Sequence, residues 1–352
     1  MEKPKVKVFK SEKYNYFFDT ESGFFARWGK DKKDDPEYSP FGCEICDMEI
    51  STICHGIDNK PCSWCYKSNT GKGQNMSFDT FKKIFHKLPK TLTQIAFGIG
   101  DIDGNTDLWK ILDYCRNNEY NYVIPNITIN GWNLTDDYAD KLSDVCGAVA
   151  VSRYSPKDVC YDAVKKLTDR GMKQVNIHML VSEETFDSCI EVMKDSKDDE
   201  RLKNLNAIVF LSLKPKGNRN QYHKLVKDKY KTLIDFAFYN DVKIGFDSCS
   251  APMFLNAVKD HKNYKNFEQL SEPCESYLFS FYINVEGKTV PCSFLEGIEG
   301  YKEIDVSNCE DFIKDVWYNE DVKKFRKTLL ATSSKNIINC KGCRSCPEFD
   351  IY

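Results

Sequence analysis

The stretch DMEISTICHGIDNKPCSWCY, residues 47–66, decides the fold of this 352-residue chain. It begins with a short apolar run, residues 47–53, of the kind that forms a buried strand, and Cys54, Cys62 and Cys65 follow at once. The loop after a strand of a parallel α/β barrel is where such a barrel carries its active site. Three thiolates on one loop can hold three irons of a 4Fe-4S cube and leave the fourth iron open to a ligand. The stretch therefore predicts a metal-binding loop at the end of a first barrel strand.

Six apolar runs alternate with six helical patterns along the middle of the chain. The apolar runs are Asp47–Ile53, Thr93–Phe97, Tyr122–Ile129, Gly147–Ser152, Gln174–Val181 and Ala207–Leu213. The helical patterns are Phe78–Leu88, Asp107–Asn117, Thr135–Cys146, Lys157–Arg170, Glu183–Lys194 and Gln221–Tyr239. Ser77 and Thr135 are typical N-caps, and Gly171 is a typical helix stop. The alternation predicts an α/β fold, a partial (β/α)6 TIM-like barrel, with an open doubly wound sheet as the alternative.

The pattern changes after about residue 243. The segments Tyr277–Val285 and Lys288–Phe294 flank Glu286-Gly287 and predict a hairpin, and residues 311–330 predict a helix before a cysteine-rich tail. We therefore expect an N-terminal extension over residues 1–44, the barrel over 45–250, and a small C-terminal cysteine-rich iron–sulfur domain over 251–352.

Composition and charge favour a cytoplasmic protein. No apolar signal opens the chain, and no run approaches the roughly 18 apolar residues of a membrane span. Fifty Lys+Arg against 53 Asp+Glu leave a net charge of −3, so no strong positive field attracts nucleic acid or an anionic membrane. In a reducing cytosol, clusters among the sixteen cysteines more often bind metal or act in redox chemistry than form disulfides.

The stretch 47–66 resembles the radical S-adenosylmethionine (radical SAM) superfamily. In that family a strand leads into a cysteine loop that closes with an aromatic residue just before the last cysteine, which Trp64 matches here. The usual spacing is C-x3-C-x2-C, whereas four extra residues separate Cys54 from Cys62. The resemblance implies that the three cysteines hold a 4Fe-4S cluster that binds SAM, and that Trp64 lies near the adenine.

The ends of the later strands carry further residues that the resemblance marks as SAM contacts. Gly98, Gly100 and Asp101 stand where the family has a Gly-Gly-Glu element, although the standard motif is absent. The other expected contacts follow in chain order: Ser152, Arg153, Asn176, His178 and Leu213. Each match is weak by itself, and a turn, a capped strand end or a satisfied polar pair is the plain structural alternative.

A structural zinc site is the competing interpretation of the first cysteines. Cys43-x2-Cys46 and Cys62-x2-Cys65 are separated by fifteen residues, a spacing also used by four-cysteine zinc sites. A strand of about seven residues between the pairs would span roughly 20 Å, too far for one tetrahedral site. We therefore expect Cys43 and Cys46 to be spare thiols.

The C-terminal cysteines resemble the auxiliary-cluster domains of radical SAM enzymes, SPASM and its shorter form Twitch. The signature C-x9–15-G-x4-C is matched by Cys274, Gly287 and Cys292, and a tail of Cys340, Cys343 and Cys346 follows. The tail lacks the full SPASM run, which favours one auxiliary 4Fe-4S cluster held by Cys274, Cys292 and two tail cysteines. A second cluster that adds Cys249 and Cys309, or a zinc site on the same thiolates, is the alternative.

Asp247 and Cys249 alternate onto one face of a short apolar strand. The resemblance marks an acid or thiol near the pocket as a group that takes a proton or hydrogen from a substrate radical, so both are candidate catalytic residues. A strand-end acid and a buried cysteine are the plain alternative.

The resemblance implies reductive cleavage of SAM to a 5′-deoxyadenosyl radical that abstracts hydrogen from a substrate. We expect a peptide or protein side chain as the substrate and flavodoxin or ferredoxin as the reductant. A small molecule or nucleotide is the alternative substrate, and a non-catalytic zinc-binding protein is the alternative class.

Overall fold

The computed structural model describes residues 4–31, 34–332 and 344–351, and its centre is a ten-stranded sheet. The strand order is β10-β9-β8-β7-β6-β5-β4-β11-β12-β13. Neighbours from β4 to β10 pair in parallel: β4 (Ile45–Glu49), β5 (Gln94–Gly98), β6 (Ile124–Ile129), β7 (Val149–Ser152), β8 (Val175–Val181), β9 (Ala207–Ser212) and β10 (Ile244–Phe246). All six predicted strands are present, and the curled parallel sheet confirms the α/β partial-barrel prediction.

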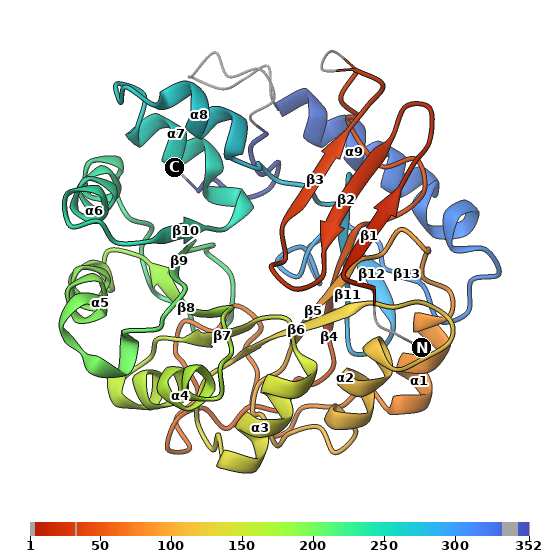
Figure 1. Ribbon diagram of the computed structural model, residues 1–352. Helices are drawn as coiled ribbons and strands as arrows, with labels where there is room; N and C mark the ends of the chain where they lie inside the picture. Colours follow the sequence, from red (N-terminus) through yellow and green to blue (C-terminus); the bar gives the residue numbers. More distant parts are fainter. Residues whose placement is uncertain (1–3, 32–33, 333–343, 352) are drawn as a thin grey trace.

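Six helices alternate with these strands and lie on the outer side of the sheet (Figure 1). They are α1 (Phe78–Phe85), α2 (Leu108–Arg116), α3 (Asp136–Val145), α4 (Lys157–Asp169), α5 (Phe186–Asp198) and α6 (Lys227–Tyr239). Ser77 Oγ accepts the Thr80 amide at 3.2 Å and Thr135 Oγ1 accepts the Tyr138 amide at 3.2 Å, so both predicted caps are confirmed. Gly171 adopts φ +82° after α4, as the predicted helix stop requires.

Helix α6 begins six residues later than predicted. Residues 213–226 instead form a loop after β9, in which the Asn218 amide donates to Ser68 Oγ at 2.8 Å and Arg219 donates to the Asn69 carbonyl at 3.1 Å. The sequence pattern missed this loop because its polar residues bind another loop rather than water.

The C-terminal region joins the same sheet. Strand β11 (Ser280–Ile283) pairs in parallel with β4, and its antiparallel pairing with β12 (Lys288–Val290) confirms the predicted hairpin. Strand β13 (Ile304–Asp305) ends the sheet. The single helix predicted over residues 311–330 is instead two elements, a π-helical turn η3 (Phe312–Trp317) and α9 (Glu320–Thr332).

Short elements that the sequence did not predict lead from β10 to β11. They are a 3-10 turn η2 (Ser248–Ser250), α7 (Ala251–Ala257) and α8 (Tyr264–Leu270); a further turn, η1 (Glu200–Leu202), follows α5. None of the helices in the described part of the chain combines the length and the apolar character that crossing a membrane requires.

A separate three-stranded antiparallel sheet forms near the N-terminus from β1 (Val6–Phe9), β2 (Asn15–Asp19) and β3 (Phe25–Trp28). It packs at the N-terminal end of the barrel strands, where Lys7 Nζ donates to the Leu92 carbonyl at 2.7 Å and Tyr16 OH to the Thr91 carbonyl at 3.1 Å. The opposite, C-terminal ends of the strands therefore stay free of it.

Candidate functional site

A cavity of about 430 Å³ lies at the C-terminal ends of the barrel strands. Each parallel strand from β4 to β9 contributes residues to its wall, and Asp47, Gly98, Ile129, Ser152, His178 and Leu211 are among them. The loop that follows β4 and the C-terminal segment around Phe294 complete the wall. The cavity thus occupies the face of a parallel barrel on which active sites form.

The three cysteines of the stretch 47–66 line this cavity together. Strand β4 ends at Glu49, and the chain then forms isolated bridges, Ser51 with Asn75 and Ile53 with Thr70. Burial, with a smaller contribution from the neighbouring thiols Cys65 and Cys54, raises the pKa of Cys62 to about 12. These thiols are therefore close enough to interact electrostatically, as ligands of one cluster must be.

Two glycines let neighbouring loops close onto the cysteine loop. A Cβ on Gly100 would lie 2.2 Å from the Ile53 carbonyl oxygen and 2.5 Å from Cys54 Cβ. A Cβ on Gly217, whose φ is +105°, would lie 2.3 Å from the Cys65 carbonyl oxygen. Only glycine fits at either position without a shift of backbone. The loops after β5 and β9 therefore press the cysteine loop into a fixed shape, which fits a preformed site for an iron–sulfur cluster.

Trp64 belongs to an aromatic group at the cavity. Its ring stacks on Tyr222 with a centroid separation of 5.1 Å and meets the edge of Tyr154 at 5.5 Å. Trp64 and Tyr154 both line the cavity. Sequence reasoning found Trp64 but missed the other two rings, because they follow β7 and β9 and no spacing links them to residue 64. Such a group offers a flat apolar surface that suits a planar base.

Gly98 lines the cavity, whereas Asp101 does not. The Asp101 Oδ2 atom accepts hydrogen bonds from the His55 amide at 2.7 Å and from His55 Nδ1 at 2.8 Å. Burial is the main cause that raises the pKa of Cys54 to about 11, and the charge of Asp101 contributes in the same direction. The Asp101 Oδ1 atom is buried and has no hydrogen-bond partner within the described residues. Asp101 thus fixes the cysteine loop, and its predicted contact with the SAM amino group remains a prediction.

Ser152 and Arg153 point in opposite directions. Ser152 ends β7 and lines the cavity, but Arg153 donates to Glu191 Oε2 of α5 at 2.7 Å and to the Tyr154 carbonyl at 3.0 Å. Successive side chains alternate across a strand, which sends the second of the two outward. Arg153 does not line the cavity, and its predicted contact with SAM remains a prediction.

The pair Asn176 and His178 shares a strand face, as predicted, but only His178 reaches the cavity. Asn176 lies two residues deeper and accepts a hydrogen bond from Asn206 Nδ2 at 2.9 Å near the N-terminal end of the barrel. Asn176 therefore does not line the cavity, and its predicted contact with SAM remains a prediction. Burial lowers the pKa of His178 to about 4, with the charge of Asp247 acting in the opposite direction. A neutral imidazole thus faces the cavity at pH 7.

Asn130 is a polar group of the cavity wall that sequence reasoning missed. It follows β6, is 8% exposed, and its Oδ1 atom accepts the Trp132 amide at 2.9 Å. Its Nδ2 atom is buried and has no partner among the described residues. A buried donor without a partner is costly, so this amide is a candidate to bind a ligand in the cavity. Sequence reasoning could have found Asn130 from its position directly after a barrel strand.

Lys214, directly after Leu213, is a buried cation on the cavity wall. Leu213 itself lines the cavity, as expected, and Lys214 is 3% exposed. The ammonium forms an ion pair with Asp247 Oδ2 and lies 4.8 Å from the centroid of the Phe294 ring. Burial lowers the pKa of Lys214, but Asp247 and Cys249 outweigh that effect and the pKa lies above its usual value. The candidate catalytic acid Asp247 therefore lines the cavity as part of an ion pair.

Four cysteines lie near this ion pair. The interaction with the Cys249 thiol holds the pKa of Cys274 below its usual value, although burial opposes it. Burial is the main cause that raises the pKa of Cys292 to about 12, and the charges of Cys249 and Cys346 contribute in the same direction. Cys274 Sγ also lies 3.5 Å from Ser276 Oγ. We name Cys249, Cys274, Cys292 and Cys346 the auxiliary thiols; the predicted ligands Cys340 and Cys343 lie outside the described residues.

Of the two candidate catalytic residues, Asp247 lines the cavity and Cys249 does not, so a catalytic role for Cys249 remains a prediction. Cys309 lies apart from the auxiliary thiols: its Sγ donates to the Val306 carbonyl at 3.2 Å, and the charged groups near it are Lys87 and three aspartates. These positions favour Cys249, rather than Cys309, as a member of the C-terminal cysteine group.

The two pairs of the zinc interpretation lie apart. Cys46 is buried inside β4 and Cys43 just before it, both 0% exposed, whereas Cys62 and Cys65 line the cavity beyond the other end of that strand. Over residues 4–31, 34–332 and 344–351, no three His, Cys, Asp or Glu side chains are arranged to hold a single metal ion. That criterion concerns the ligands of one ion, whereas the thiolates of a 4Fe-4S cube each bind a different iron.

A polar hollow of about 810 Å³ adjoins the cavity and shares four lining residues with it: Glu49, Tyr66, Lys67 and Asn69. It runs between the end of the cysteine loop and the β11–β12 hairpin, whose Asn284 and Glu286 line its far side. The four shared residues place the hollow directly beside the cavity.

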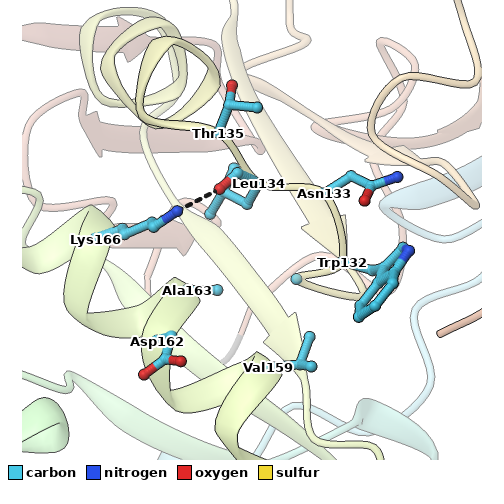
Figure 2. A pocket seen from close by; sticks show the side chains of 9 residues that line it. Trp132, Asn133, Leu134, Thr135, Val159, Asp162, Ala163 and Lys166 are labelled. Carbon is cyan, nitrogen blue, oxygen red and sulfur yellow. Dashed lines mark hydrogen bonds between the residues drawn. The ribbon is translucent and has the colours of Figure 1, made fainter. Parts of the chain in front are cut away.

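A smaller hollow of about 350 Å³ lies between the loop after β6 and helix α4 (Figure 2). Lys166 Nζ donates to the Leu134 carbonyl at 2.8 Å across it, and Asp162 on its wall pairs with Arg201 at 2.9 Å. Its described lining contains no thiol or imidazole. Its charged side chains are thus already paired, and we assign it no role.

Residues 274–347 match the SPASM family, an iron–sulfur cluster-binding domain. They include Cys274, Cys292 and the three tail cysteines but not Cys249. No curated protein matches the chain.

Solved structures share the fold over most of the chain. Streptococcus suis SuiB bound to the precursor peptide SuiA has 11% identity and a TM-score of 0.69, and the match covers 94% of this chain and 91% of that one. SuiB bound to S-adenosylmethionine has 12% identity and a TM-score of 0.62 over 84% of this chain and 70% of that one. The enzyme anSMEcpe with bound AdoMet and the Cp18Cys peptide has 17% identity and a TM-score of 0.58, covering 81% and 83%.

Proposed function

We infer that this chain, which joins the fold of the radical SAM enzymes to a C-terminal SPASM iron–sulfur domain, is a radical SAM enzyme that abstracts hydrogen from a peptide or protein side chain. The observation that carries the inference is the convergence of Cys54, Cys62 and Cys65 on a cavity at the catalytic face of the barrel. Gly100 and Gly217 let neighbouring loops pack closely against that loop. Trp64, which belongs to the loop, stacks on Tyr222.

The three thiols of the first loop would hold a 4Fe-4S cluster, and SAM would bind at its open iron. When bound, the cluster supplies the electron that cleaves SAM to methionine and the 5′-deoxyadenosyl radical. The aromatic group of Trp64, Tyr154 and Tyr222 would bind the adenine and exclude water from the cavity. Gly98, Ser152 and Leu213 stay candidate SAM contacts, because all three line the cavity.

Polar groups on the remaining wall would orient the substrate. Asn130 offers a buried donor, and His178 offers a neutral imidazole at pH 7 because burial lowers its pKa to about 4. Asp247 lines the cavity in an ion pair with Lys214, a position from which its carboxylate would accept a proton when the substrate loses one. We keep Asp247 as the candidate catalytic acid–base and propose a ligand role for Cys249.

The auxiliary thiols Cys249, Cys274, Cys292 and Cys346 would hold one auxiliary 4Fe-4S cluster within the SPASM region. Their mutual electrostatic interactions and burial support this assignment. We propose that the barrel spans residues 45–250 and the auxiliary domain 251–352, with a shared sheet through β4 and β11 joining them. A flavodoxin or ferredoxin would supply the electron.

The substrate proposal rests on the polar hollow beside the cavity. With about 810 Å³ next to the cysteine loop, the hollow offers room for the flanking residues of a peptide whose reacting side chain would enter the cavity. Peptides are bound by two proteins of the same fold, SuiB and anSMEcpe. A small molecule or nucleotide is the alternative substrate, and the volume of the cavity, about 430 Å³, is the observation that favours it.

The proposed function is tested with the anaerobically reconstituted chain, SAM and dithionite. Short Cys- or Ser-rich peptides encoded beside the gene are compared with a pool of nucleotides and sugars, and 5′-deoxyadenosine is quantified together with the mass of each peptide. We expect a peptide to raise 5′-deoxyadenosine formation about tenfold above the uncoupled rate and to change in mass. Stimulation by the small molecules alone would favour the alternative substrate, and no 5′-deoxyadenosine under any condition would contradict the enzyme assignment.

A further inference from the structure

Lys214 lies on the cavity wall beside two segments that carry auxiliary thiols. Its side chain is 2% exposed and lines the cavity together with Asp247. The ammonium pairs with Asp247, two residues before Cys249, and lies 4.8 Å from the ring centroid of Phe294, two residues after Cys292. It also interacts electrostatically with Cys249, Cys292 and Cys346. The chain thus buries one positive charge next to both places where redox chemistry is proposed.

The orientation of this ammonium is set by a chain of buried hydroxyl groups. Asp247 accepts a hydrogen bond from Ser250 Oγ, and Ser250 Oγ lies 2.6 Å from Ser212 Oγ. Both serines are nearly inaccessible, at 0% and 4% exposed. Asp247 is therefore held in place by the start of α7 and the end of β9, and it holds Lys214 in turn.

Stability alone does not explain why the ion pair of Lys214 and Asp247 is buried. A buried pair contributes little net stability compared with apolar residues of the same volume, because both charges lose their hydration. Lys216, two residues on, instead directs its ammonium to the Ser293 and Glu296 carbonyls. The burial of Lys214 beside three auxiliary thiols is therefore better explained by an electrostatic effect of its ammonium on those thiols.

We propose that Lys214 is the charge-compensating residue of the auxiliary cluster: its buried ammonium, oriented by Asp247, stabilises the cluster in its reduced, more negative state. The proposal rests on the proposed function in one respect, that the auxiliary thiols hold a 4Fe-4S cluster. The reduction potential of such a cluster depends on nearby charge, hydrogen bonds to sulfur and solvent exposure. A positive charge in a medium of low dielectric favours the state with the extra electron.

The test measures the auxiliary cluster alone in the full-length chain. Cys54, Cys62 and Cys65 are all changed to alanine so that only the auxiliary cluster remains, and its reduction is followed by electron paramagnetic resonance during a potentiometric titration. In this background we expect Lys214→Met to shift the midpoint potential to more negative values. Asp247→Asn removes the compensating negative charge and should shift it to more positive values, and Lys214→Arg should stay close to the parent.

Opposite shifts from the two substitutions separate a charge effect from a packing effect, because damaged packing would not reverse its sign. If Lys214→Met assembles no cluster, the sign of the Asp247→Asn shift decides by itself. A loaded cluster whose potential is unchanged by Lys214→Met, or lowered by Asp247→Asn, overturns the role of Lys214. A background chain without iron overturns the auxiliary cluster itself, and SAM cleavage by the parent chain is then still measured separately.

Discussion

Changing both Cys62 and Cys65 to alanine is expected to abolish SAM cleavage while leaving about half of the roughly 8 irons of two 4Fe-4S clusters in the chain. Both thiols line the cavity beside Cys54, and the carbonyl of Cys65 packs against Gly217. The auxiliary thiols belong to another part of the structure and keep their own metal. Iron per chain and 5′-deoxyadenosine formation after anaerobic reconstitution measure the two effects.

Cys146→Ala is the matched control for this prediction. Cys146 is buried at the C-terminal end of α3 and its neighbours include Arg116, not the cavity. The control should keep all of the iron and the parent rate of SAM cleavage. Persistence of SAM cleavage in the Cys62 and Cys65 double variant would show that these residues do not hold the catalytic cluster, and complete loss of iron would show that the two groups of thiols are not independent.

Changing Arg27 to methionine is expected to lower the free energy of unfolding by about 3–5 kcal/mol at pH 8, the usual cost of leaving buried charges unpaired. Arg27 lies on β3 and pairs with Glu44 at 2.6 Å and Glu275 at 2.6 Å, which stand before β4 and β11. Its guanidinium carbon lies 3.5 Å from the centroid of the Phe279 ring. One side chain thus ties the N-terminal sheet to the first barrel strand and the C-terminal region.

The cost of Arg27→Met should depend on pH. Burial raises the pKa of Glu44 from 4.5 to about 7, although Arg27 and Tyr14 pull it down. Since the folded chain binds this proton more tightly than the unfolded chain, stability from this group is full below about pH 4.5 and is lost as the pH rises through about 7. Without Arg27 the pKa of Glu44 rises further, so the substitution should cost much less at pH 5 than at pH 8.

Denaturant unfolding at the two pH values, followed by circular dichroism, measures this difference. Glu272→Gln is the control: Glu272 contacts the same arginine at 3.2 Å but its side chain is 64% exposed. An exposed pair is worth roughly 0–1 kcal/mol, so the control should change stability little. Equal losses from Arg27→Met at pH 5 and pH 8 would contradict the buried-charge explanation.

The barrel could be predicted from the sequence because its signals are local. Apolar runs such as Ala207–Leu213 are bounded by polar residues, and the caps Ser77 and Thr135 bind amides three residues on. The N-terminal sheet was missed because its strands are short and it is stabilised by contacts distant in sequence, such as the pair of Arg27 with Glu44.

Parts of the candidate site escaped prediction for a related reason. Order along the chain shows which strand end carries a residue, but not its depth or direction there. Asn176 lies too deep, and Arg153 follows the last inward side chain of β7 and turns to α5. The grouping of Cys249 with Cys274 joins residues 25 positions apart through the fold between β10 and β11, and no spacing rule for cysteines covers such a gap.

The central claim is that one chain holds two separate 4Fe-4S clusters and that SAM binds only the cluster of Cys54, Cys62 and Cys65. The most direct measurement is electron paramagnetic resonance of the reduced, reconstituted chain before and after SAM is added. We predict two 4Fe-4S signals, of which SAM shifts one, and that one is missing when the three cysteines are changed to alanine. A spectrum that SAM leaves unchanged, or a SAM-sensitive signal that survives in the triple variant, would contradict the account.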